Sequence, residues 1–437
     1  MRNQPALPAP AKTNKNPADK LNALSGMRFF LVMGIAIGHF VGVYLDDFPG
    51  WVGKVATSYY FCTSTFFVLS GFVLAYVYFD GRRGIRIPDG RFWVARLSKI
   101  YPLHLIFVLL LTPAFLKHGQ QAAIAQGLQP GGLLLPAMYL SQVFALDAWN
   151  PFIVSVNLPA WSVSALCFFY LVFPAFCRRI KSAPLSRLYT WALLLWAAYL
   201  VCPAVYTLLD LDKSPHAVVY NGLLHHNPLL RLPEFLIGVL AARIFMVHRE
   251  NGVEAFYDRI PPSVAVAVAL LAWTVLPGFV PHALLHNGLF LPVQLLLILA
   301  LAGGRDTVTR FFSHPVPVRL GNASLTIFIS HYFILGWWGR VDQGFRFILG
   351  QLSHGWPGAT GFMESLYRLK GQQSNPSFAS FLVGLAVLVV ASLQIQRYFV
   401  DPLSRWLRRK HERKTADRQI QVTQPLPKEV QEVNGPS

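Results

Sequence analysis

Long apolar stretches occupy most of this chain and are the feature that most restricts its fold. Segments of about 20 predominantly apolar residues recur between about residue 26 and about residue 396, and about 20 helical residues are needed to cross the hydrocarbon core of a bilayer. Charged residues make up 13% of the chain and hydrophobic residues 54%, whereas about a quarter of the residues of soluble domains are charged. The sequence therefore predicts an all-α integral membrane protein, and it excludes a mainly disordered chain or a disulfide scaffold.

The apolar stretches predict a bundle of about ten transmembrane helices. We place them at about residues 26–45, 59–79, 100–116, 160–176, 188–209, 231–247, 263–281, 287–303, 322–338 and 378–396. The stretch Gly131–Phe144 is apolar but short, and we expect it to be interfacial or re-entrant. The membrane domain is expected to cover residues 23–409, between disordered cytoplasmic tails at residues 1–22 and 410–437.

The formal net charge of +18 is interpreted by position, because Lys and Arg concentrate in the cytoplasmic loops of membrane proteins. Basic residues gather in both tails, between the second and third spans and between the fourth and fifth. An even number of spans then predicts that both termini are cytoplasmic, and the charge is not taken as a sign of nucleic-acid binding. The first span contains Arg28 and His39, so we expect it to be retained rather than removed as a signal peptide.

Arg28 and His39 are the clearest functional candidates, because ionisable residues inside a bilayer are costly. They are eleven residues apart, so a helix places them on one face, with a rise of about 16.5 Å between them. Gly34 and Gly38 lie between them and allow another helix to approach closely. We predict a polar stripe from the cytoplasmic mouth to beyond the middle of the membrane. In the alternative interpretation Arg28 reaches the head groups and His39 is hydrogen bonded within the bundle.

Three further ionisable residues lie in or beside predicted spans. His331, in the ninth span, either shares a cavity with the first-span histidine or bonds a neighbouring carbonyl group. Arg231 and Glu234 begin the sixth span on the predicted outer side. Glu234 either caps that helix and pairs with Arg231, or lines the outer opening of a cavity and meets a polar substrate.

Arg96 and Lys99 open the third span at the predicted cytoplasmic face. Their spacing of three residues places both cations on one face of a helix, where they would suit a phosphate group. The alternative is ordinary positive charge at the cytoplasmic side.

No metal is expected, because the pair His225–His226 has no third ligand at a clear spacing. The four cysteines are expected to be buried as small apolar side chains.

Seven motifs follow one another along the predicted spans. They are Leu24–Phe30 with Gly38–Phe40, Phe66–Phe72, Arg91–Pro102, Trp161–Ser164 with Phe169–Pro174, Asn227–Gly238, Leu320–His331 and Asp401–Arg405. In this order the set resembles the acyltransferase 3 family of bacterial inner-membrane O-acyltransferases. One departure stands out, since this chain has Leu166 and Cys167 where the family usually has an acidic residue.

The resemblance implies transfer of an acyl group, most commonly acetyl, from cytoplasmic acyl-CoA to a hydroxyl group at the outer face of a bacterial inner membrane. Acyl-CoA would be a co-substrate, with no permanently bound cofactor. The expected acceptor is a carbohydrate, an exopolysaccharide or its lipid-linked repeat. A polysaccharide-assembly complex is left open as a partner. The candidate acceptor-binding residues are Glu234, Arg231, His331 and Trp161.

The residues themselves fit that chemistry. Coenzyme A carries several phosphates, and Arg28, Arg96 and Lys99 supply cations at the cytoplasmic mouth. A hydroxyl group is a weak nucleophile at neutral pH, and His39 is predicted to take its proton as general base. Arg28 is the second candidate catalytic residue. An oxyanion donor is also required, and the candidates are Ser70, Ser164 and Tyr170.

Two other functions stay open from the residues alone. A multi-span transporter would use His39, His331 and Arg28 to line a proton or substrate path. A structural membrane component of a polysaccharide export complex would tolerate the loss of His39. Neither alternative would depend on coenzyme A.

Overall fold

Helices make up most of the part of the chain that the structure describes. The computed structural model describes residues 21–44, 53, 58–152, 155, 157–353 and 378–423. In chain order its main elements are α1 (Asn22–Tyr44), α3 (Tyr60–Tyr78), β1 (Phe79–Asp80), β2 (Gly84–Ile85), α4 (Asp89–Ala125), α5 (Leu134–Val143), α6 (Trp161–Ile180), α7 (Leu185–Leu208), α8 (Ala217–His226), α9 (Pro228–Asn251), α10 (Pro262–Val275), α11 (His282–Leu284), α12 (Leu291–Gly303), α13 (Thr307–Ser313), α14 (Pro315–Asn322), α15 (Ser324–Ser353), α17 (Phe378–Ile395) and α18 (Asp401–Thr423). The strands β1 and β2 form a short antiparallel hairpin.

Each of the ten predicted spans coincides with a helix, which confirms the all-α membrane class. By length and composition, seven helices of the described chain can cross a membrane; they begin at Asn22, Tyr60, Asp89, Leu158, Leu185, His282 and Phe378. The helix α10 has only 14 residues. The helices α9 and α15 are long enough, with 24 and 30 residues, but polar residues interrupt their apolar sequence. The total of ten spans and the side of the termini therefore remain predictions.

The helices α5 and α18 fall on two segments that the sequence assigned outside the membrane spans. The apolar stretch at 131–144 contains α5, a helix of 10 residues, which at 1.5 Å per residue is too short to span a bilayer. The helix α18 continues to Thr423, so the described chain is helical across part of the range assigned to a disordered tail from residue 410. Its Lys, Arg, Glu and Gln residues favour helix. The tail segments 1–20 and 424–437 lie outside the described residues.

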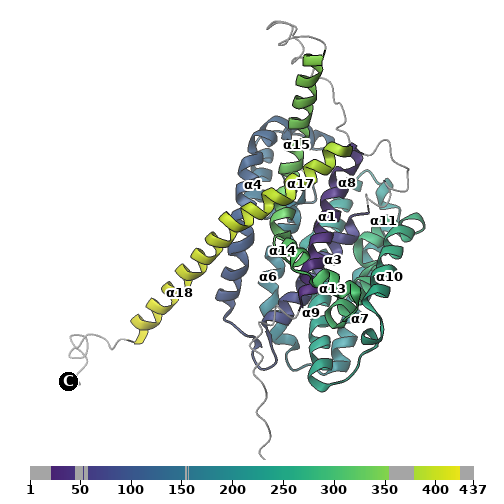
Figure 1. The fold of residues 1–437 in the computed structure, drawn as a ribbon, viewed down its shortest axis with the longest axis vertical. Coiled ribbons are helices and arrows are strands. Elements are labelled where there is room, and N and C mark those ends of the chain that lie inside the picture. Colours follow the sequence, from purple (N-terminus) through teal and green to yellow (C-terminus); the bar gives the residue numbers. More distant parts are fainter. Residues whose placement is uncertain are drawn as a thin grey trace, which may run out of the picture.

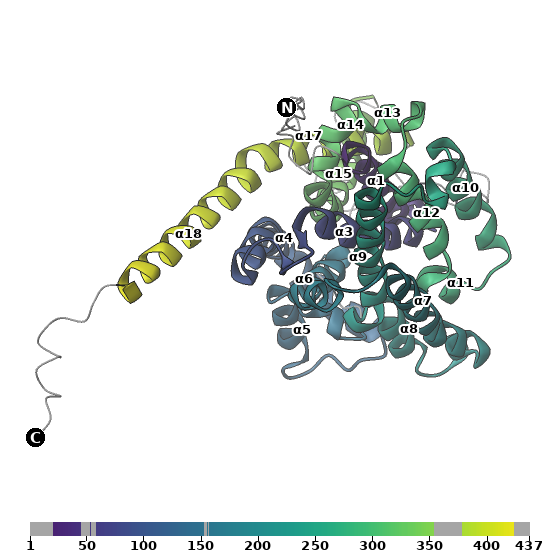
Figure 2. The ribbon, with the colours of Figure 1, turned by 90° about the horizontal axis from the view of Figure 1, so that it is seen from below.

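The closest helix pair is α3 and α9, at the centre of the bundle (Figure 2). A Cβ atom added at Gly71 would lie 2.0 Å from the carbonyl oxygen of Phe235, and one added at Gly238 would lie 2.0 Å from that of Val68. Only glycine fits at both positions, so the two backbones touch, as is common between membrane helices. The helices α1, α6, α7, α12 and α15 surround this pair (Figure 2).

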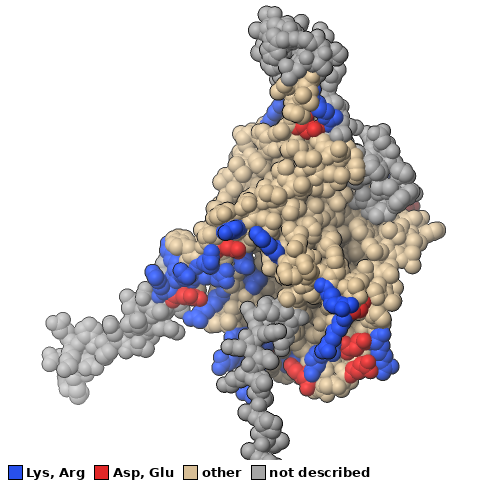
Figure 3. Space-filling model, in the orientation of Figure 1, with Lys and Arg blue, Asp and Glu red and all other residues tan. Residues whose placement is uncertain are grey.

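The surface separates an apolar flank from a basic end. Lys and Arg gather around the first part of α18 and at the lower end of the bundle, and the flank between this region and the far end of α15 is almost free of charge (Figure 3). Large apolar side chains of the membrane helices are exposed, for example Leu109 on α4, Leu193 on α7 and Leu270 on α10. An apolar flank of this extent is unfavourable in water and matches lipid. The helix α18 runs away from the bundle (Figures 1 and 2).

Candidate active site

A cavity of about 260 Å³ lies between α1, α3, the start of α6, the end of α8, α11 with the turn that follows it, and α15. Its walls are mainly aromatic rings and imidazoles. The lining residues include His39, Tyr59, Tyr60, Thr63, Trp161, His225, His226, His282, His286 and Phe328. None of the described lining residues is acidic, so the available bases of this cavity are imidazoles.

The helix α1 holds His39 at the cavity wall because it packs tightly on Tyr59. A Cβ atom added at Gly38 would lie 2.4 Å from the Tyr59 ring, so only glycine allows this approach. The His39 and Tyr59 rings meet edge to face, with centroids 4.6 Å apart. The close approach that the sequence predicts from the glycines of the first span is thus present, and it restricts the orientation of the His39 ring.

The second contact of His39 is with His331 on α15. His39 Nδ1 lies 2.8 Å from His331 Nε2, and the two rings are within 5° of parallel. His331 is buried, and its Nδ1 lies 2.6 Å from the carbonyl oxygen of Phe328. Both alternatives that the sequence left for His331 are therefore realised, since it contacts the first-span histidine and bonds a neighbouring carbonyl group.

These two distances assign the tautomers. A carbonyl oxygen can only accept, so His331 Nδ1 carries a hydrogen and donates it to Phe328. The Nε2 of the neutral His331 ring is then an acceptor, and His39 Nδ1 must donate to it. The hydrogen of neutral His39 is used in this bond, which leaves Nε2 with a free lone pair. His39 is thus prepared to accept a proton from a group in the cavity.

Arg28, Arg96 and Lys99 lie together near the basic end of the bundle. Arg28 interacts electrostatically with Arg96, and Lys99 interacts with both of them and with Arg408 of α18. We call these four residues the basic cluster. Arg96 donates to the Tyr78 hydroxyl group, but within the described chain no member forms an ion pair with a carboxylate. Asp401 interacts electrostatically with Lys99 and is one negative charge beside four positive ones, so the cluster is suited to an anionic ligand.

Arg231 and Glu234 are buried inside the helix bundle. One sequence interpretation had placed them at the outer opening of a cavity. Both side chains are 0% exposed, and Arg231 Nη2 lies 3.0 Å from Glu234 Oε2. Ser64 and Tyr199 donate to Glu234, and Arg231 donates to the carbonyl oxygen of His286 at 2.7 Å. Neither residue lines the cavity. The structure therefore agrees with the alternative in which the pair holds helices together, although Asn227, not Glu234, caps α9.

Trp161 stands where the cavity meets a smaller pocket, and it lines both. Its ring meets the His226 ring edge to face, with centroids 4.8 Å apart. His225 Nδ1 lies 2.9 Å from His286 Nδ1. Among the described residues no group of three or more His, Cys, Asp or Glu side chains is arranged to hold a metal ion.

The candidate oxyanion donors of the sequence do not line the cavity. Ser70 donates to the carbonyl oxygen of Phe66 in its own helix at 2.7 Å. Ser164 is buried and has no hydrogen-bond partner among the described residues, and Tyr170 interacts electrostatically with the basic cluster. Two other residues with hydroxyl groups, Tyr59 and Tyr60, line the cavity. No sequence signal distinguishes these two tyrosines from others.

Sequence reasoning missed three more residues. His282 and His286 line the cavity, and their spacing of four residues, which places both on one helical face, is a signal that could have identified them. Asp147 lines the smaller pocket and interacts electrostatically with Cys167. An acidic group from the segment before α6 is therefore present close to the position at which the acidic residue of α6 is missing.

The fold and the cavity define a polytopic helical membrane protein that encloses a cavity lined by imidazoles. The family model described as an acyltransferase domain matches residues 21–395. The chain therefore belongs to the acyltransferase 3 family, as the sequence motifs predict. It is an acyl-transferring membrane enzyme, and this membership decides against the transporter and the structural component.

Curated relatives agree with this class. Acyltransferase MdmB from Streptomyces mycarofaciens is 27% identical over 337 residues, which cover 74% of this chain and 81% of that protein. Putative O-acetyltransferase SACOL0978 from Staphylococcus aureus (strain COL) is 19% identical over 422 residues, which cover 88% of this chain. The match spans only 63% of the length of SACOL0978. No solved structure matches the chain.

Proposed function

We propose that this membrane O-acyltransferase moves an acyl group, acetyl in the first instance, from acyl-CoA to a hydroxyl group of a carbohydrate acceptor. The observation that carries the proposal is the hydrogen-bond chain from His39 through His331 to Phe328, which leaves His39 Nε2 free as a base. Similarity to Putative O-acetyltransferase SACOL0978 supports acetyl as the group and oxygen as its acceptor.

In the proposed reaction the acceptor hydroxyl group donates its hydrogen bond to His39 Nε2. As the hydroxyl oxygen attacks the thioester carbonyl carbon, its proton moves to Nε2. The tetrahedral intermediate collapses, the bond from carbon to sulfur breaks, and the proton passes from His39 to the departing thiolate. The products are an ester and free coenzyme A, and His39 returns to its neutral tautomer. The hydroxyl group of Tyr59 or Tyr60 is the proposed donor to the oxyanion.

The basic cluster supports acyl-CoA as the donor. Arg28 and His39 lie on the same helix, and their separation of eleven positions corresponds to a rise of about 16.5 Å. A phosphate group at Arg28, Arg96 and Lys99 would leave the thioester to reach His39 on the extended pantetheine arm. Arg28 thus acts in donor binding in this proposal, and its candidate catalytic role is to position the thioester.

The proposed orientation follows from the charge distribution. The basic end of the bundle would face the cytoplasm of a bacterial cell, because Lys and Arg mark the cytoplasmic side. Both termini would then lie in the cytoplasm, and the cavity would open to the outer side of the inner membrane. An exopolysaccharide or its lipid-linked repeat is the proposed acceptor class, since the aromatic walls of the cavity suit sugar rings.

The test is release of thiol from acetyl-CoA by purified protein in detergent, with and without a crude polysaccharide fraction of the native host. Wild type is expected to release thiol only with acceptor, and His39→Ala is expected to release none. His216→Ala is the matched control, because His216 is exposed and lies outside the cavity. Equal release by wild type and His39→Ala would remove His39 from the chemistry.

A further inference from the structure

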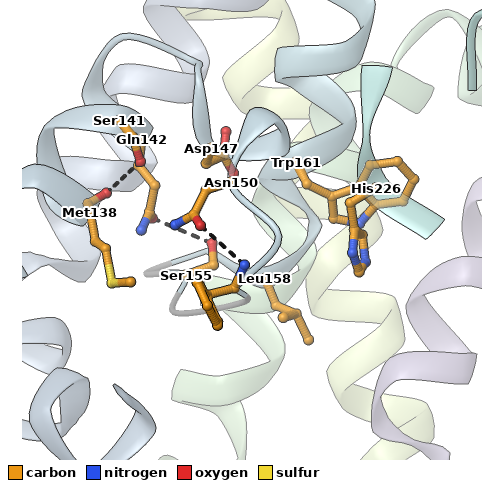
Figure 4. A pocket seen from close by; sticks show the side chains of 10 residues that line it. Met138, Ser141, Gln142, Asp147, Asn150, Ser155, Leu158, Trp161 and His226 are labelled. Carbon is orange, nitrogen blue, oxygen red and sulfur yellow. Dashed lines mark hydrogen bonds between the residues drawn. The ribbon is translucent and has the colours of Figure 1, made fainter. Parts of the chain in front are cut away.

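A second pocket adjoins the cavity, and its chemistry is different. Its volume is about 20 Å³, and its walls include Gln142, Asp147, Asn150, Ser155, Trp161 and His226 (Figure 4). We call it the Asp147 pocket. Trp161 and His226 belong to both spaces. A ligand held in the Asp147 pocket therefore lies directly beside the cavity that contains His39.

The Asp147 carboxylate lacks the partner that a buried charge requires. Both of its oxygens are inaccessible to solvent, and no side chain of the described residues donates a hydrogen bond to them. The backbone amides of Asp147 and Ala148 favour its charged form, but burial outweighs them and raises the pKa of Asp147 to about 7. No Lys or Arg of the described residues pairs with it. Buried carboxylates are normally paired or fully hydrogen bonded, so this one is arranged for a ligand.

His226 presents a further unfilled acceptor. Its Nδ1 is buried without a hydrogen-bond partner among the described residues. The neutral ring carries one hydrogen, so a ring with that hydrogen on Nε2 keeps a lone pair on Nδ1. Burial and the charge of Arg231 lower the pKa of His226 to about 4, so the ring is neutral at physiological pH. The pocket thus offers acceptors at Asp147 and His226, and a matching ligand must donate.

Size and charge narrow the ligand to one chemical group. A cavity of about 20 Å³ holds a group about as large as one water molecule. A primary ammonium group has this size, carries three N–H donors and compensates the charge of Asp147. A single hydroxyl group would supply only one donor and no charge. Among these groups the ammonium satisfies the most unfilled acceptors of the pocket.

We propose that the Asp147 pocket binds a protonated primary amine carried by the acceptor, so that the acceptor is an amine-bearing alcohol such as an amino sugar. This assignment of the acceptor rests on the proposed acyl transfer. Because Trp161 and His226 are shared, an acceptor anchored by its ammonium group places a neighbouring part of the molecule in the cavity. Asp147 then fixes which hydroxyl group reaches His39 Nε2.

The pocket itself is tested without acyl-CoA. The probe is methylammonium chloride at pH 8, and the measurement is the apparent Tm of the purified protein in detergent. Tetramethylammonium chloride at equal concentration is the reference, because it has the same charge but no N–H donor and is too large for the pocket. Methylammonium is expected to raise the Tm of wild type above the reference, since a ligand that binds only the folded state stabilises it.

Two variants locate the effect. Asp147→Asn keeps the shape of the side chain and is expected to lose the additional stabilisation. Asp212→Asn is the matched control, because Asp212 is exposed and outside the pocket, and it is expected to keep the effect. Equal Tm values with the two salts in wild type would overturn the proposal. The same holds if the methylammonium effect persists in Asp147→Asn.

The acceptor is tested by thiol release from acetyl-CoA with two simple sugars, methyl glucosaminide and methyl glucoside. Wild type is expected to use the amino sugar with at least tenfold higher kcat/KM, and Asp147→Asn is expected to lose this preference. Asp212→Asn is expected to keep the preference, which separates amine binding from general damage. No thiol release with any acceptor, together with stabilisation by methylammonium, would refute the proposed transfer from acetyl-CoA and leave the amine pocket standing.

Discussion

His39 Nδ1 lies 2.8 Å from His331 Nε2, although the two residues are 292 positions apart in the chain. The pair resembles a catalytic His with its orienting partner, except that the partner is a second neutral imidazole instead of a carboxylate. His331 can fix the tautomer of His39 through its own bond to Phe328. It offers no negative charge to stabilise the imidazolium ion, so the proton taken from the acceptor should move on quickly to the leaving thiolate.

The first prediction concerns this partner. His331→Ala is expected to lower kcat by roughly 10- to 100-fold with little change in the KM for acetyl-CoA, because His39 loses its orientation but not its proton-accepting atom. His331→Gln should restore part of the rate, since its amide offers an acceptor to His39 and a donor to Phe328. The measurement is steady-state thiol release. A role only in packing would show no rescue by Gln over Ala.

The second prediction concerns donor binding. Arg96→Ala is expected to raise the KM for acetyl-CoA about tenfold or more and leave kcat nearly unchanged, because charge-assisted hydrogen bonds contribute about 1.5–3 kcal/mol. Arg179→Ala is the control, since Arg179 is an exposed arginine at the end of α6, outside the basic cluster. If both variants have the wild-type KM, Arg96 contributes only positive charge at the cytoplasmic side.

The third prediction uses the titration of Asp147. Burial raises its pKa from 3.8 to about 7, so the folded state binds a proton more tightly than the unfolded state. Stability is therefore lost as pH rises from about 4 to above 7, where the folded state must hold an unpaired charge. Asp147→Asn should raise the apparent Tm of the ligand-free protein by a few degrees at pH 8 and have no effect near pH 4. An equal Tm shift at both pH values would contradict this assignment.

The fourth prediction concerns the central helix pair. Gly238→Ala would place a Cβ atom 2.0 Å from the carbonyl oxygen of Val68, so α3 and α9 must move apart. We expect a clear loss of thermal stability, measured as the apparent Tm in detergent or as the yield of monodisperse protein. Gly278→Ala is the control, because nothing lies within 4 Å of a Cβ atom at that position. A wild-type Tm for Gly238→Ala would show that the contact is dispensable.

The parts that were predictable from the sequence depend on local regularities. A bilayer of fixed thickness requires apolar helices of a certain length, so the apolar stretches located the helices. The helical repeat placed Arg28 and His39 on one face of α1, and the same repeat placed Arg96 and Lys99 on one face of α4. The family motifs added the chemistry, and the family match confirmed the acyl-transferring class.

Only the tertiary structure decided which polar groups meet. The pairing of His39 with His331 depends on how α1 and α15 pack, and no local pattern encodes that contact. Arg231 and Glu234 have the same spacing whether they line a cavity or pair in the core, and the neighbours Ser64 and Tyr199 determine the outcome. Asp147 looks like an ordinary loop carboxylate in the sequence. Its burial without a partner arises from the packing of separate segments around it, because the cost of an unpaired charge depends on everything that surrounds it in space.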